Sequence, residues 1–296
     1  MKTIFIDGSY GTVGLILSDL VDEHPLLTQI KVPYSERKNI TERMELIEQS
    51  DIVVTCLPNK AIDDVVNSIP ITTKLIDCST RYRCDESWIY GLPELKSNQR
   101  ELIGESSRTV NAGCFASAFI LAIKPLVKNK VISKEMVVSS FSLTGYSAGG
   151  VKMIQQYEKG DYIQKLHSLN FNHKHLPEMK KYSGLLNAPH FIPAIGHHRE
   201  GLILTIPLNV NCGRDELLDV FFREYGAEEN ICIKDNCPDS LEPNFQANNN
   251  LEIYVGGRCG SLSITTRLNN LYKGAAGNAL QCINLMLGFD ENIGLK

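Results

Sequence analysis

The sequence predicts an α/β protein in two parts: an N-terminal unit built on a parallel sheet, then a unit of the α+β class. Over the first hundred or so residues, short apolar runs alternate with helical patterns, which is typical of parallel strands joined by crossover helices. From about Val137 the apolar runs are longer and richer in β-branched residues, which indicates a mostly antiparallel sheet. This change in the pattern of apolar runs places the boundary between the two units near Asn111.

The expected elements follow from these patterns in chain order. The strands of the first unit are expected at Thr3–Ile6, Gln29–Val32, Asp51–Leu57 and Lys74–Asp77. Those of the second unit are expected at Val137–Phe141, Gly201–Leu208, Leu251–Val255 and Ser261–Thr265. The last segment, Lys273–Leu287, is apolar at helical spacing and is followed by Gly288, a residue that commonly ends helices.

Composition narrows the class of protein. A chain of 296 residues with 22% charged side chains suits a globular protein of one large or two smaller domains. The net charge of -4 argues against nucleic acid as a partner, because such surfaces normally carry a basic excess. The chain shows neither a membrane-spanning run nor a signal-peptide pattern, and its nine cysteines form no CxxC pair. We therefore expect reduced thiols and a cytoplasmic protein.

A glycine-rich turn directly follows the first expected strand and opens a helix. In this position glycines let backbone amides approach a pyrophosphate, and the helix dipole favours its negative charge. The spacing is GxxGxxG, a relative of the commoner GxGxxG. A plain structural turn is the alternative. We expect a dinucleotide at Gly8, Ser9, Tyr10, Gly11, Thr12, Val13 and Gly14.

The segment after the second expected strand bears on which dinucleotide is bound. An acid there suits the ribose 2′-hydroxyl of NAD, whereas cations suit the 2′-phosphate of NADP. Ser35, Arg37 and Lys38 favour NADP, while Glu36 keeps NAD open. A solvated loop is the alternative without function.

Cys114 stands out among the cysteines because a loop ending in Gly113 leads into an apolar helical stretch that runs to Leu126. A thiol at a helix N-terminus is favoured as thiolate, the reactive form. A free cysteine is more often a small buried hydrophobe, and this interpretation suits Cys56, Cys78 and Cys282. Cys114 is the candidate nucleophile.

A nucleophilic cysteine needs an acid/base partner. The densest polar cluster contains His173, His175 and Glu178, and the pair His197 and His198 is the next candidate. A metal site is the rival interpretation for such a cluster. An HxH pair without a companion cysteine or acidic motif is thin support for zinc, so we expect no metal.

Two further stretches have the character of ligand loops. The first follows the strand at Lys74–Asp77 and carries Arg81 and Arg83, whose guanidinium groups suit oxyanions. The second, Ser142–Gly150, is glycine-rich and would form an amide-lined anion cradle. Either stretch alone would also suit an ordinary loop.

Taken together, these motifs resemble the short form of N-acetyl-gamma-glutamyl-phosphate reductase, an enzyme family of arginine biosynthesis. The Gly-Cys and HKHLPE motifs are the specific ones, whereas many families share the glycine turn. The similarity extends over nearly the whole chain: GSYGTVG at Gly8–Gly14, CLP at Cys56–Pro58, DCST at Asp77–Thr80, YGLPEL at Tyr90–Leu95, GCFAS at Gly113–Ser117, GYSAGG at Gly145–Gly150, HKHLPEM at His173–Met179 and NLYKGAAGNALQ at Asn270–Gln281.

The resemblance implies a Rossmann NADP-binding domain over 1–112, to which a C-terminal helix over about 273–296 returns, and a catalytic and dimerisation domain over 113–272. It implies Cys114 as nucleophile and His175, chosen over His173, as acid/base. Implied contacts to substrate come from Arg83, Arg81, His173 and Glu178, and further cofactor contacts come from Gly149 and Asn270.

The activity implied is reduction of N-acetylglutamyl 5-phosphate by NADPH through a cysteine thioester, in a homodimer or homotetramer. Two rivals stay open. Aspartate-semialdehyde dehydrogenase shares the architecture and the cysteine, although HKHLPEM and GYSAGG fit it less well. A non-catalytic NADP-binding sensor would keep the fold without turnover.

Overall fold

Residues 1–160, 164–243 and 246–295 are described by a computed structural model, and they fold into two units. The first unit is Met1–Ala112 with Ala275–Lys296, and the second is Gly113–Gly274. The chain therefore leaves the first unit at Ala112 and re-enters it for its last segment.

The first unit is built on a six-stranded sheet in which every pairing is parallel. Its strand order is β2-β1-β3-β4-β6-β5. The order reverses next to β1, because the chain passes to β2 on one side and then to β3 on the other. The strands are β1 (Lys2–Asp7), β2 (Leu27–Ile30), β3 (Ile52–Thr55), β4 (Lys74–Asp77), β5 (Ile89–Gly91) and β6 (Arg108–Asn111).

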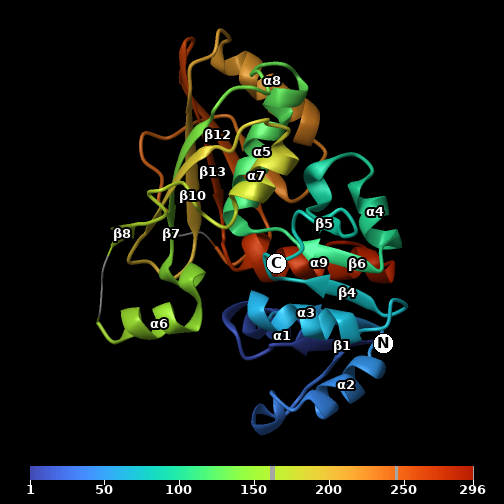
Figure 1. Ribbon diagram of the computed structural model, residues 1–296. Helices are drawn as coiled ribbons and strands as arrows, with labels where there is room; N and C mark the ends of the chain where they lie inside the picture. Colours follow the sequence, from blue (N-terminus) through green and yellow to red (C-terminus); the bar gives the residue numbers. More distant parts are fainter. Residues whose placement is uncertain (161–163, 244–245, 296) are drawn as a thin grey trace. The chain divides into compact units, whose positions relative to one another are not determined.

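Helices cover this sheet, and β3 is buried along its whole length, as expected for a parallel strand covered on both faces. The C-terminal helix α9 packs against α1, α4 and the strands β4 to β6 (Figure 1). The helices are α1 (Thr12–Asp22), α2 (Ile40–Glu48), α3 (Asn59–Ser68), α4 (Gln99–Glu105) and α9 (Gly277–Leu287), with short 3-10 turns η1 (Tyr34–Glu36) and η2 (Pro93–Leu95).

The second unit contains a seven-stranded mixed sheet in the order β11-β12-β13-β10-β7-β9-β8. The pairs β11–β12 and β7–β9 are parallel, and the other pairs are antiparallel. The expectation of a mostly antiparallel sheet is therefore met only in part. The strands are β7 (Ser139–Thr144), β8 (Lys165–Leu166), β9 (His190–Ile195), β10 (Leu202–Leu208), β11 (Ile231–Lys234), β12 (Leu251–Arg258) and β13 (Ser261–Leu268).

Residues in β10 and β13 alternate between buried and more exposed positions, so one face of this sheet is covered. The cover is α5, which contacts β10, β13, α7 and α8 (Figure 1). The helices are α5 (Cys114–Lys128), α6 (Gly150–Glu158), α7 (Leu176–Ser183) and α8 (Arg214–Tyr225), with the 3-10 turn η3 (Tyr146–Gly149) and the π-helical turn η4 (Tyr272–Ala276).

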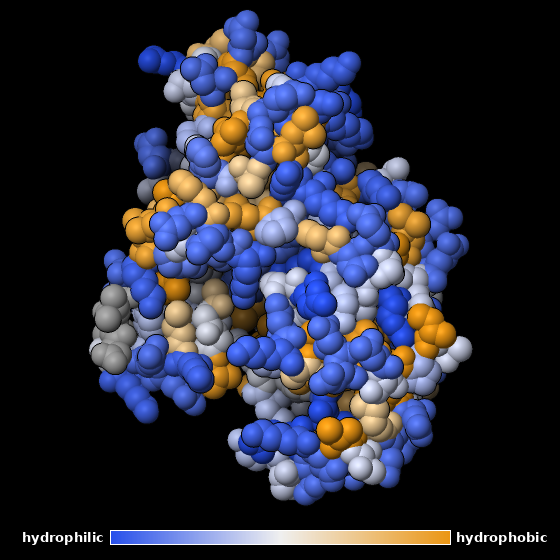
Figure 2. Space-filling model, in the orientation of Figure 1, coloured by the Kyte–Doolittle hydropathy of each residue, from blue (hydrophilic) through white to orange (hydrophobic). Residues whose placement is uncertain are grey.

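Several boundaries differ from those expected. The second strand is Leu27–Ile30 rather than Gln29–Val32, and the strand expected at Val137–Phe141 is Ser139–Thr144. The final α-helix begins at Gly277, because the expected first turn is π-helical. Surface composition is mixed, and Figure 2 shows hydrophobic residues scattered among hydrophilic ones on the face in view. Within the described residues, no helix is long and apolar enough to cross a membrane.

Candidate active site

The glycine turn lies at the point where the strand order reverses, between the carboxyl end of β1 and the start of α1. Open α/β sheets bind their ligands at such a point. Gly8 has a φ of 91°, and a Cβ there would lie 2.6 Å from the carbonyl oxygen of Cys56. A Cβ at Gly14 would lie 2.3 Å from the carbonyl oxygen of Gly8. Both positions therefore require glycine, and the turn presents bare backbone.

The first residue of α1 carries a polar atom that suits a ligand. Thr12 Oγ1 is buried, and no hydrogen-bond partner for it is found among the described residues. The N–H groups of the first helical turn also have no partner within the helix. A pyrophosphate would satisfy both, so the residues present fit the phosphates of a dinucleotide.

Beside this turn, two aromatic rings and a guanidinium group pack against one another. Tyr10 meets Tyr34 edge to face, with ring centroids 5.0 Å apart, and its hydroxyl donates to the Val32 carbonyl. The guanidinium of Arg37 lies 3.5 Å from the centre of the Tyr34 ring. Arg37 and the turn residue Tyr10 thus both contact the Tyr34 ring, while Ser35 and Lys38 are exposed on the same segment.

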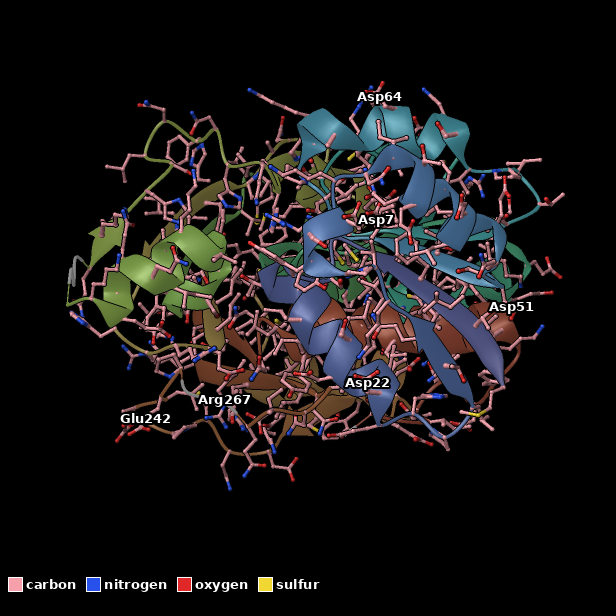
Figure 3. The ribbon with its side chains drawn as sticks, turned by 90° about the horizontal axis from the view of Figure 1, so that it is seen from below. Asp7, Asp22, Asp51, Asp64, Glu242 and Arg267 are labelled. Carbon is pink, nitrogen blue, oxygen red and sulfur yellow. The ribbon has the colours of Figure 1, made fainter. Side chains whose placement is uncertain are left out.

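Glu36 has a local role. Its Oε2 accepts a hydrogen bond from Asn39 Nδ2 at 3.1 Å, and Asn39 Oδ1 in turn accepts from the Thr41 N–H as the N-cap of α2. Another charged pair was not predicted: Arg43 donates from Nε to Asp7 Oδ1 at 3.0 Å and also binds Oδ2. Asp7 is buried at the end of β1, where Figure 3 shows it inside the unit.

The two arginines that follow β4 lie in different surroundings. Arg81 is half-exposed and pairs with Asp63 of α3 through Nε, at 3.0 and 3.1 Å. Arg83 is buried, and its guanidinium contacts the Cys78 carbonyl oxygen at 3.5 Å. The structure therefore separates these two candidate anion ligands, and only Arg83 lies in the interior of the unit.

In the second unit, Cys114 is the first residue of α5, and Gly113 is the extended N-cap. This places the Cys114 thiol at the positive end of a 15-residue helix, where a thiolate is stabilised. Cys114 is partly exposed, whereas the helix that follows is almost wholly buried. Gly274 of η4 borders the cysteine, because a Cβ there would lie 2.6 Å from Cys114 Cβ. Sequence reasoning missed Gly274.

The histidine cluster is buried and lies beside the start of α5. The ring of Phe115 lies 5.4 Å from that of His173 and 5.8 Å from that of His175, between centroids. His173 Nδ1 accepts from the backbone N–H of His175 at 3.1 Å. Because its Nδ1 is an acceptor, the neutral His173 ring carries its proton on Nε2.

Glu178 joins this cluster to the cysteine loop. Its Oε2 accepts a hydrogen bond from the Gly113 N–H at 3.2 Å, and its Oε1 lies 3.9 Å from His175 Nε2. The carboxylate is only 1% exposed, which makes both contacts stronger than at the surface. We expected Glu178 at the substrate; the contacts found connect it to the loop that carries the nucleophile.

Gly149 and Asn270, which were predicted as further cofactor contacts, both belong to the surroundings of the GYSAGG turn. Gly149 is the N-cap of α6. Asn270 is buried; it donates from Nδ2 to Ser147 Oγ at 3.0 Å and accepts from the Gly201 N–H at 2.7 Å. Contact of Gly149 and Asn270 with cofactor stays a prediction. Among the residues described, no three His, Cys, Asp or Glu side chains are grouped to hold a metal ion.

Comparison with known proteins agrees with this arrangement. Residues 3–103 match the family described as "Semialdehyde dehydrogenase, NAD binding domain" and residues 114–270 match "Semialdehyde dehydrogenase, dimerisation domain". The chain is 32% identical to N-acetyl-gamma-glutamyl-phosphate reductase 2 of Nostoc sp., over 99% of this chain and 98% of the relative. It is 31% identical to N-acetyl-gamma-glutamyl-phosphate reductase 2 of Pseudomonas putida, over 96% of each.

Solved structures of low sequence identity share the fold. The aspartate semialdehyde dehydrogenase II of Vibrio cholerae, complexed with ASA, superposes with a TM-score of 0.73 at 13% identity, over 97% of this chain and 98% of that one. The aspartate semialdehyde dehydrogenase of Candida albicans with NADP gives 0.70 at 13% identity, over 97% and 99%. Full-length identity above 30% with named reductases, together with the two matched domains, shows that the chain belongs to the N-acetyl-gamma-glutamyl-phosphate reductase family of semialdehyde dehydrogenases.

Proposed function

We propose that this protein reduces N-acetyl-L-glutamyl 5-phosphate to N-acetyl-L-glutamate 5-semialdehyde and phosphate with NADPH, a step of arginine biosynthesis. The observation that carries the proposal is the link made by Glu178 between the loop of the cysteine and His175. This link ties the loop that carries the nucleophile to the acid/base group, and covalent catalysis requires the two to be held together.

The first half of the reaction is acyl transfer to Cys114. The thiolate attacks the carbonyl carbon of the acyl phosphate, and the carbon–oxygen bond to phosphate breaks, so a thioester forms and phosphate leaves. The amide groups at the start of α5 face the developing oxyanion with the positive end of the helix dipole. The buried Glu178 carboxylate keeps the Gly113 backbone in place during this step.

The second half is reduction of the thioester. A nicotinamide dinucleotide held at the glycine turn would supply the hydride that reduces the thioester carbon. His175 then protonates the thiohemiacetal oxygen and takes the proton back when the carbon–sulfur bond breaks, which releases aldehyde and regenerates the Cys114 thiolate. We assign the substrate's anionic groups to the buried Arg83, with Arg81 as a second candidate, and a further substrate contact to His173.

For the dinucleotide, we favour NADP over NAD. The glycine turn, the open first turn of α1 and the buried Thr12 hydroxyl support binding of its pyrophosphate. Glu36 is hydrogen-bonded to Asn39, which caps α2, and so is less suited to hold a ribose 2′-hydroxyl. Positive charge for a 2′-phosphate comes from Arg37 and Lys38. The guanidinium of Arg37 lies over the ring of Tyr34.

We further propose a homodimer or homotetramer in the cytoplasm. The matched dimerisation domain supports self-association of the second unit. Phe141 of β7 is 47% exposed, and Phe171, which stacks on His190 of β9, is 44% exposed, which suits a face covered by a second copy. The nine cysteines are all free thiols, as in a reducing compartment.

Trapping the acyl group tests this function directly. With NADP and N-acetylglutamate 5-semialdehyde but without phosphate, the enzyme should form one equivalent of NADPH and stop with an acyl group on Cys114. Peptide mapping should find the acyl mass on the Cys114 peptide, and Cys114→Ser should abolish both signals while Cys84→Ser keeps them. Acylation of another cysteine, with Cys114 unmodified, would refute the assignment.

A further inference from the structure

Two cysteines that take no part in this chemistry end neighbouring strands of the first unit. Cys56 directly follows β3 and Cys78 directly follows β4. The two strands pair in parallel with Thr55 opposite Asp77, so the next position along the register sets Cys56 opposite Cys78. The ladder of hydrogen bonds continues there, because the Cys78 N–H donates to the Thr55 carbonyl at 2.9 Å.

The two cysteine side chains lie on the same face of the sheet. Thr55 Oγ1 donates to Asp77 Oδ1 at 3.0 Å, so these two side chains share one face of the sheet. Successive residues point to opposite faces, which puts both cysteine side chains together on the other face. Neighbouring strands lie about 4.8 Å apart, within the span of roughly 4.4–6.8 Å between the Cα atoms of a disulfide.

This pair borders the glycine turn. The Cys56 carbonyl oxygen fills the space in which a Cβ of Gly8 would lie, at 2.6 Å. The Cys56 N–H donates to the carbonyl of Asp7 at 2.7 Å. A change in the Cys56 backbone is therefore passed to the turn, because Cys56 is hydrogen-bonded to Asp7, the residue that precedes Gly8.

We propose that Cys56 and Cys78 form a reversible disulfide in the presence of a hydroperoxide, and that this disulfide weakens binding of the dinucleotide at the glycine turn. The second part rests on the proposed function. The Cys78 thiol is oxidised to a sulfenic acid while the hydroperoxide is reduced to water or an alcohol. The Cys56 sulfur then attacks the Cys78 sulfur, and the S–S bond forms as water leaves.

The order of events follows from the surroundings of Cys56. The neighbouring Cys78 side chain and desolvation raise the pKa of the Cys56 thiol above the usual range. A raised pKa lowers the fraction of Cys56 that is thiolate, the species that reacts with oxidants. Both cysteines are partly exposed, so an oxidant can reach Cys78, and Cys56 then resolves the sulfenic acid.

The experiment uses the full chain with Cys114→Ser, because oxidation of the proposed nucleophile would otherwise confuse the result. The protein is treated with hydrogen peroxide, quenched with catalase and digested with trypsin without reductant. A Cys56–Cys78 disulfide joins peptide 44–60 to peptide 75–81, and mass spectrometry detects the pair. NADPH binding is measured by fluorescence before oxidation, after it and after dithiothreitol.

We expect the joined peptides in most molecules and a Kd for NADPH raised about tenfold or more, within the usual range of coupling between sites. Dithiothreitol should reverse both changes. Cys78→Ala should abolish both, whereas Cys84→Ala, which removes a nearby exposed thiol, should leave them.

Oxidation of other cysteines without the joined peptides would overturn the proposal, and so would a disulfide that leaves the Kd unchanged. A reduced protein that does not bind NADPH would instead overturn the proposed function. The peptide map would still show in that case whether the disulfide forms.

Discussion

The carboxylate of Glu178 accepts a hydrogen bond from the Gly113 backbone at 3.2 Å while its other oxygen lies 3.9 Å from His175 Nε2. One buried side chain therefore positions both the N-cap of the cysteine helix and the proposed acid/base. Of the groups in the cluster, Glu178 is the one whose removal should disturb acylation and proton transfer together.

Glu178→Gln should lower kcat on the order of 100-fold, the effect of a small misplacement of reacting groups. The amide can still accept from Gly113, but it lacks the charge that favours protonated His175. The limb of the pH–rate profile that belongs to the histidine should therefore move to lower pH. Steady-state kinetics over pH measure both effects, with the exposed Glu135→Gln as control. An unchanged profile with reduced stability would leave Glu178 a purely structural role.

The two histidines of the cluster should differ in their effect on catalysis. His175→Asn should lower kcat about 100-fold or more and flatten one limb of the pH–rate profile, as expected for loss of a general acid/base. His173→Asn should act less strongly, because His173 Nδ1 is engaged by the His175 N–H. His190→Asn, an exposed histidine of β9, is the control. If His173→Asn gives the larger loss, the roles within the pair are reversed.

Cofactor preference should depend on the cations that follow η1. Replacing Arg37 and Lys38 with alanine should raise the KM for NADPH roughly 10- to 100-fold, the equivalent of one charge-assisted hydrogen bond, and change the KM for NADH little. Lys96→Ala, an exposed lysine elsewhere, is the matched control. Equal effects on both dinucleotides would mean that neither cation touches the 2′-phosphate.

The glycine beside the nucleophile should tolerate no side chain. A Cβ at Gly274 would lie 2.6 Å from Cys114 Cβ, so Gly274→Ala should displace the thiol and cost on the order of 100-fold in kcat. Gly213→Ala is the control, since its Cβ would meet its nearest neighbour at 3.7 Å. Thermal unfolding of both variants separates misplacement from misfolding. Full activity of Gly274→Ala would show that the cysteine has room to move.

The local features of the fold were predictable from sequence because neighbouring residues determine them. The glycine turn after β1 and the start of α5 at Cys114 are examples. Short elements carried too little periodicity: β8 has two residues and β5 has three. Strand β9 contains Pro193, which obscured its pattern.

Contacts between distant segments could not be read from the chain. Glu178 and Gly113 are 65 positions apart, and their hydrogen bond depends on how α7 packs against α5. The closeness of Gly274 to Cys114 and of Cys56 to Cys78 likewise depends on tertiary packing and on strand register. The HKHLPE motif indicated that Glu178 matters, but only the structure shows what it contacts.

The reverse reaction, measured with and without phosphate, tests the central claim most directly. An acyl group on Cys114 needs phosphate as acceptor to leave as acyl phosphate, whereas water would give the free acid. NADP reduction with N-acetylglutamate 5-semialdehyde should therefore depend on phosphate, accept arsenate in its place, and exceed turnover of aspartate semialdehyde. The missing methylene alone accounts for about 10- to 200-fold, and the missing acetyl amide widens the gap. Sustained turnover without phosphate would contradict the acyl-phosphate chemistry, and faster turnover of aspartate semialdehyde would contradict the proposed substrate.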